Sequence, residues 1–90
     1  NAPLSPAAHL DRKQEAAYLS QLGERVRAWR KAHGMTRKAL AAASGVSERY
    51  LAQLEAGRGN VSVLLLQRIA AALNLPLTQL CFDPRLHLLP

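Results

Sequence analysis

The chain has 90 residues, enough for one small domain with a modest hydrophobic core. Hydrophobic residues make up 49% of it, but alanine and leucine dominate them and aromatic residues contribute only 4%, which favours an all-helical fold. The 12 basic and 6 acidic residues suit a polyanionic partner, nucleic acid first and an anionic membrane surface second. Because no apolar run approaches the roughly 20 residues that span a bilayer, we expect a cytoplasmic protein.

The histidines and the cysteine do not form a recognisable catalytic pattern. His9, His33 and His87 fall in an arm, a helix end and a tail, and no spacing gathers them with a carboxylate. Cys81 is the one cysteine of the sequence, so it cannot form an internal disulfide or a multi-thiolate metal site. We therefore expect no enzyme, no catalytic residue, no metal site and no cofactor.

The first helix is expected to begin near Asp11. Pro3 and Pro6 disfavour regular structure before it, so residues 1–17 are predicted to be an N-terminal arm that leaves room for a helical extension. Asp11 and Gln14 have the spacing of a capping box, and Gly34 suits the position after a helix end. Gly23 weakens the helix interior, which leaves open whether residues 11–22 form a separate piece. The residues expected on one face of this helix are Leu19, Leu22, Val26 and Trp29.

Two short helices are predicted next. Thr36 caps a two-turn helix over residues 36–43, Gly45 makes the following turn sterically cheap, and Ser47 caps a third helix that ends at Ala56. On a helical wheel, the buried side of the third helix carries Leu51 and Leu54, and the outward side carries Arg49, Tyr50, Ala52 and Gln53.

The last two helices follow a glycine-rich loop over residues 57–60. Ser62 caps the fourth helix and Pro76 starts a short fifth. The inward residues of the fourth helix are predicted to be Val63, Leu66, Ile69, Ala70 and Leu73. Residues 18–83 are thus expected to form one compact five-helix bundle. The apolar ending predicts a fragment, in which residues 84–90 begin a linker to a missing C-terminal domain.

The stretch from Leu22 to Leu80, centred on TRKALAAASGVSERYLAQLEAGRGN, resembles the helix-turn-helix domains of the Cro and phage-repressor type, also called the xenobiotic-response-element family. In such domains the second of two short helices enters the major groove of DNA. The resemblance implies a transcriptional regulator that binds double-stranded DNA as a homodimer. For Glu55 it implies a structural role near the second helix.

The same resemblance implies which residues contact DNA. It places Arg37 and Lys38 on phosphate, and it assigns Arg58 and Asn60 to a loop that clamps the backbone. Two alternatives stay open, because Arg49 could contact phosphate instead of a base and Tyr50 could cover the edge of the core. The full set of predicted DNA-binding residues is Arg37, Lys38, Ser47, Glu48, Arg49, Tyr50, Gln53, Arg58 and Asn60.

Residues 47–66, SERYLAQLEAGRGNVSVLLL, show a closer resemblance to benzoyl-CoA-responsive regulators fused to a shikimate-kinase-like domain. It implies a repressor of an aromatic, benzoate-type catabolic operon, whose effector, an aromatic acyl-CoA, binds the domain that is missing here. The expected dimer surface is Leu64 or Leu65, the first helix, or the tail from Leu86 to Leu89. The alternatives are a DNA-binding antitoxin and a protein-interaction module on the same scaffold.

Overall fold

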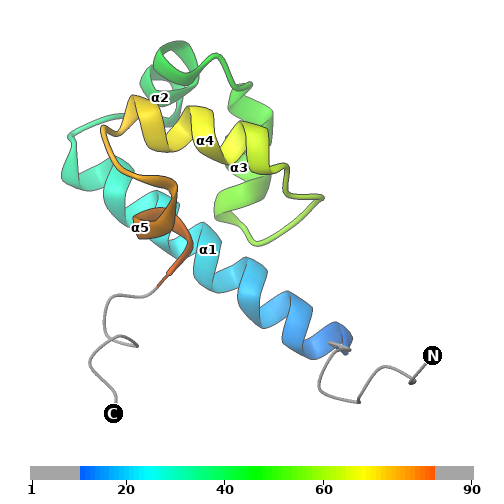
Figure 1. Ribbon diagram of the computed structural model, residues 1–90. Helices are drawn as coiled ribbons and strands as arrows, with labels where there is room; N and C mark the ends of the chain where they lie inside the picture. Colours follow the sequence, from blue (N-terminus) through cyan, green and yellow to red (C-terminus); the bar gives the residue numbers. More distant parts are fainter. Residues whose placement is uncertain (1–10, 83–90) are drawn as a thin grey trace.

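The computed structural model describes residues 11–82, which form five α-helices and no strand (Figure 1). The helices are α1 (Arg12–Ala32), α2 (Arg37–Ser44), α3 (Glu48–Glu55), α4 (Val63–Ala72) and α5 (Leu77–Cys81). The predicted all-α architecture of five helices is confirmed. The arm before Asp11, the linker over 84–90 and the proposed dimer tail lie outside the described residues. No helix within 11–82 is long and apolar enough to cross a membrane.

Each of the first four helices starts at the predicted capping residue. Asp11 and Gln14 form the reciprocal capping box, with Oδ1 of Asp11 accepting the Gln14 N–H at 2.8 Å. The hydroxyl oxygens of Thr36, Ser47 and Ser62 each accept a backbone N–H three residues later, at 3.0, 3.0 and 3.4 Å. Each cap satisfies one of the N–H groups that a helix start leaves without an intrahelical partner.

The first helix is continuous, which excludes the alternative of a separate piece over residues 11–22, and α1 runs through residues 17 and 18 without a break. Gly23 is buried where α1 meets α3. A β-carbon there would overlap the carbonyl oxygen of Leu54 and lie 2.9 Å from that of Glu55. Gly23 therefore allows two helix backbones to approach closely, which offsets its cost to the helix interior. The N-terminal turns of α1 extend beyond the other helices (Figure 1).

The core gathers the C-terminal half of α1 and one face of each remaining helix. Its buried residues are Val26, Leu40, Val46, Leu51, Leu54, Leu66, Ile69, Ala70, Leu73 and Leu80. The prediction that Val63 points inward is wrong, because Val63 begins α4 one turn before Leu66, where the core ends, and is 62% exposed. Of the two leucines that follow, Leu64 is 69% exposed and Leu65 packs against the core.

Candidate nucleic-acid interface

The turn between α2 and α3 fixes the angle between the two helices. Gly45 adopts the left-handed conformation, φ 73°, that ends α2 without steric cost, as predicted. Ser44 is buried beside it, and its hydroxyl donates to the Leu40 carbonyl at 2.7 Å and accepts the Val46 N–H at 3.2 Å. Val46 then enters the core. Sequence reasoning identified the glycine but missed the hydrogen bonds of Ser44.

The helix that follows has two chemically different sides. Leu51 and Leu54 are 0% and 2% exposed, whereas Glu48, Arg49 and Gln53 are exposed. The predicted separation of the two sides of α3 is confirmed for Leu51, Leu54, Arg49 and Gln53. Tyr50 and Ala52, which were also predicted to lie outward, are half-buried. The outward side thus presents an acid, a guanidinium group and an amide, which are side chains able to hydrogen-bond to the edges of bases.

Tyr50 lies between these two sides. It is half-buried and packs against the core, and its hydroxyl oxygen accepts the backbone N–H of Ser62 at 3.2 Å. The structure thus contains the contact with the core edge that was one of the two alternatives. Because the hydroxyl acts as acceptor here, its own hydrogen stays available for donation to a phosphate oxygen.

The residues predicted to contact phosphate flank α3. Arg37 and Lys38 are exposed in the first turn of α2, and Arg58 and Asn60 are exposed in the loop after α3. This loop is fixed to the helix by the Arg58 N–H, which donates to the Gln53 carbonyl at 2.8 Å. The hydroxyl of Ser47 accepts the Tyr50 N–H and keeps its hydrogen for a donor contact. The structure therefore places the predicted residues at the start of α2, along α3 and in the adjoining loop.

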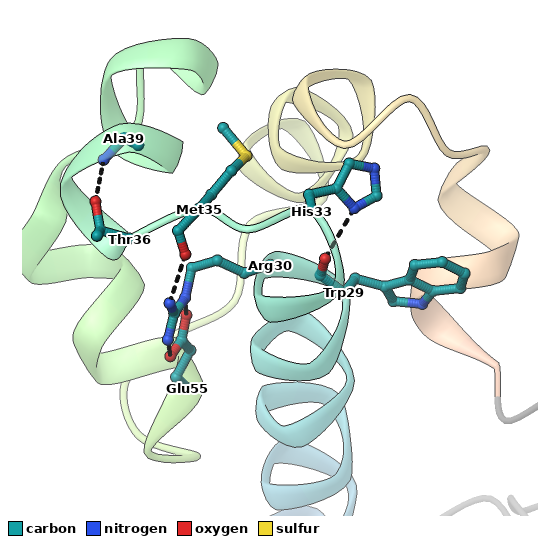
Figure 2. Close-up of polar contacts among 7 residues, drawn as sticks. All are labelled: Trp29, Arg30, His33, Met35, Thr36, Ala39 and Glu55. Atoms are coloured by element: carbon teal, nitrogen blue, oxygen red, sulfur yellow. Dashed lines mark hydrogen bonds and ion pairs between the residues drawn. The ribbon is translucent and has the colours of Figure 1, made fainter.

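A buried ion pair joins the end of α3 to α1, as Figure 2 shows. Arg30 of α1 donates from Nε and Nη2 to the two carboxylate oxygens of Glu55, at 2.7 and 2.9 Å, and from Nη1 to the Met35 carbonyl at 2.9 Å. The side chains of Arg30 and Glu55 are only 11% and 4% exposed. The hydrogen bond to Glu55, aided by Coulomb attraction, raises the pKa of Arg30, although burial alone would lower it.

Glu55 therefore has the structural role expected of it, and its partner Arg30 was missed. One pair joins α1, the connection to α2 and the end of α3. The role of Arg25 was also not predicted. Its Nε and Nη2 donate to the carbonyls of Leu80 and Cys81 at 2.8 Å each, and these hydrogen bonds hold the end of α5 against α1. Among residues 11–82, no group of three or more His, Cys, Asp and Glu residues is placed to bind a metal ion.

Two capped helices, a glycine turn and an exposed polar second helix flanked by arginine and lysine define a helix-turn-helix DNA-binding domain. Residues 26–80 match the helix-turn-helix family HTH_3, and the chain belongs to this Cro/C1-type family. The predicted resemblance to Cro and phage repressors is thereby confirmed. The family comprises transcription regulators and not enzymes, so the expectation of a non-enzymatic protein is also confirmed.

Solved structures agree with this assignment. The restriction-modification controller protein C.AhdI from Aeromonas hydrophila is 34% identical with a TM-score of 0.69, over 71% of this chain and 97% of that one. The clp gene regulator ClgR from Corynebacterium glutamicum is 38% identical with a TM-score of 0.66, over 70% and 67% of the two chains.

An HTH_3 family transcriptional regulator from Vibrio cholerae is 29% identical with a TM-score of 0.73. The match covers 80% of this chain but 41% of that one, so the regulator from Vibrio cholerae is much longer. None of these three structures is named as a benzoyl-CoA-responsive regulator. No curated protein matches the sequence significantly.

Proposed function

We propose that this chain is the sequence-reading domain of a cytoplasmic transcriptional repressor that binds an inverted DNA repeat as a homodimer. The observation that carries the proposal is the exposed side of α3, where Arg49 and Gln53 lie free of the core while Leu51 and Leu54 anchor the helix. An α-helix of this kind fits the major groove, which is about 12 Å wide. The names of the controller protein C.AhdI and the gene regulator ClgR support regulation as the function.

The outward residues of α3 have chemically distinct roles in this proposal. Arg49 can donate two hydrogen bonds to guanine, Gln53 can pair with adenine, and Glu48 can accept from cytosine. Phosphate contacts come from the flanking groups and set the register of α3 on the duplex. The residues proposed for those contacts are Arg37, Lys38, Ser47, Tyr50, Arg58 and Asn60.

The dimer places two copies of α3 in successive major grooves, about 34 Å apart. Of the two leucines considered for the dimer surface, Leu64 is the better candidate because it is 69% exposed, whereas Leu65 packs against the core. Repression follows if the bound dimer covers a promoter and excludes the polymerase.

The test is selection of bound duplexes from a random library, followed by anisotropy titration of the enriched sequence and of scrambled DNA. Enrichment of an inverted repeat with higher affinity than scrambled DNA would support the proposal. Gln53→Ala should then cost about 1 to 3 kcal/mol on the enriched sequence and reduce discrimination at one base pair. Gln67→Ala, an exposed glutamine on α4, is the matched control. Absence of binding even at low salt would overturn the proposal and favour a protein-interaction module.

We further propose that the regulated genes encode degradation of an aromatic acid, with an aromatic acyl-CoA as effector. The support is the resemblance of residues 47–66 to benzoyl-CoA-responsive regulators. The enriched operator should then occur upstream of genes for aromatic catabolism in the source genome. An operator found only beside a toxin gene would replace this proposal with the antitoxin alternative.

A further inference from the structure

A surface hollow of about 280 Å³ lies where α1, α2 and α3 meet. Its lining residues are Arg27, Arg30, Arg37, Ala52, Glu55 and Ala56. The hollow borders α3 along Ala52 and Ala56, which are four residues apart and so lie on one face, and Ala56 is exposed at the helix end. Arg27 is not among the residues predicted to bind DNA.

The spacing of residues along α1 explains why Arg27 points here. Gly23, Arg27 and Arg30 are separated by four and three residues, which places them on one face of a helix. Gly23 meets the carbonyl groups of Leu54 and Glu55, and Arg30 meets the Glu55 carboxylate. Arg27 lies between these two contacts along α1, so it belongs to the face of α1 that is directed toward α3.

The charges around the hollow are unbalanced. The carboxylate of Glu55 is paired with Arg30, and this is the single ion pair among the described residues. Arg27 and Arg37 are exposed and form no hydrogen bond or ion pair within residues 11–82. Two arginine side chains without an anionic partner therefore line one small hollow, and Ala52 and Ala56 leave room beside them. Guanidinium groups bind phosphate oxygens with paired, charge-assisted hydrogen bonds.

We propose that Arg27 and Arg37 together bind one backbone phosphate of DNA in this hollow. The inference rests on the proposed function and adds a contact from α1, ten residues before the helix-turn-helix unit. A phosphate held beside Ala52 would fix how deeply α3 enters the groove and would position its base-reading side chains. Arg27 is thus a positioning residue, and its contact does not depend on the DNA sequence.

The first test is the salt dependence of DNA binding by Arg27→Ala, with Arg68→Ala as control. Arg68 is an exposed arginine of α4 that does not line the hollow, so both variants lose the same charge. Loss of one phosphate contact should reduce the magnitude of the slope of log K against log salt by about 0.9 for each bound subunit, and it should weaken operator and scrambled duplexes by the same factor. Arg27→Lys should restore the slope. An unchanged slope in Arg27→Ala, or an equal change in Arg68→Ala, would overturn the inference.

The second test replaces each operator phosphate in turn with a neutral methylphosphonate. One position in each half-site should weaken binding of the unaltered protein and weaken that of Arg27→Ala less, because in the variant only Arg37 still contacts that phosphate. Equal sensitivity of both proteins at every position would contradict the inference. If no operator is enriched, sequence reading fails, and the slope on scrambled duplex still decides whether Arg27 contacts phosphate. If the protein binds no DNA at low salt, both proposals fail.

Discussion

The two sides of α3 differ in almost every physical respect, although they belong to one helix of eight residues. The inner side is held by Leu51 and Leu54, by the Arg30–Glu55 ion pair and by the close approach of Gly23. The outer side carries Arg49 and Gln53, which are exposed.

This difference separates folding from recognition within the helix. Substitutions on the inner side change packing or leave a buried charge without its partner, and both are costly. Substitutions on the outer side remove groups that water already solvates. Stability should therefore depend on the inner residues, and DNA sequence preference on the outer ones.

The largest expected loss of stability is that of Glu55→Ala. Removing the carboxylate leaves the Arg30 guanidinium buried without its counter-charge, which should cost about 3 to 5 kcal/mol of unfolding free energy in urea titrations. Glu24→Ala, an exposed acid on α1, is the control and should change stability by less than about 0.5 kcal/mol. Because the pKa of Arg30 is raised, arginine stays charged and this contribution should persist into moderately alkaline solution. A loss no larger than that of the control would mean that the pair does not support α3.

Gly23→Ala should have the next largest effect. Alanine is intrinsically better than glycine in a helix by up to about 1 kcal/mol, so an unconstrained site would be stabilised. At Gly23 the added methyl group would overlap the Leu54 carbonyl and force α1 away from α3, so we expect a loss of about 1 to 3 kcal/mol. Thermal unfolding of Gly23→Ala beside Gln21→Ala, which is exposed on the same helix, would show the sign. A stabilised variant would refute the close approach of the two helices.

Local features of this fold could be predicted from sequence and long-range features could not. A capping residue acts on an N–H three residues away, so Asp11, Thr36, Ser47 and Ser62 were identified correctly. The buried side of α3 follows from helical periodicity in the same way. The Arg30–Glu55 pair spans 25 residues, and its geometry depends on how α1 crosses α3.

The same reason explains why the alternative of a separate piece over residues 11–22 stayed open and why the expectation for Val63 was incorrect. Gly23 weakens a helix in isolation, but only the packed structure shows that α3 needs the space of its missing side chain. Val63 has the helical phase of a core residue, yet its place at the first position of α4 leaves it beyond the core. Arg27 shares the hollow with Arg37 because α1 and α2 both pack against α3, and no local sequence pattern predicts that arrangement.

Tyr50→Phe tests the residue at the border of the two sides. The change keeps the ring and removes the oxygen that accepts the Ser62 N–H at 3.2 Å, so we expect a loss of about 0.5 to 1.5 kcal/mol in unfolding free energy. Tyr18→Phe is the matched control, because Tyr18 is 60% exposed. If Tyr50 also donates to phosphate, the variant binds DNA more weakly by a similar factor on all sequences. No change in either quantity would mean that the hydroxyl of Tyr50 contributes neither to stability at the core edge nor to DNA binding.

The smallest effect on folding should come from Arg49→Ala. The side chain is exposed and forms no ion pair within residues 11–82, so unfolding free energy should change by less than about 0.5 kcal/mol. Binding to the enriched operator should nevertheless weaken by about 1 to 3 kcal/mol, with the preference for guanine lost at one position. Anisotropy titrations against the operator and its single-base variants would measure this, with Arg12→Ala as an exposed control on α1. An equal loss on every sequence would assign Arg49 to phosphate, and a loss of stability comparable to that of Glu55→Ala would break the separation of the two sides of α3.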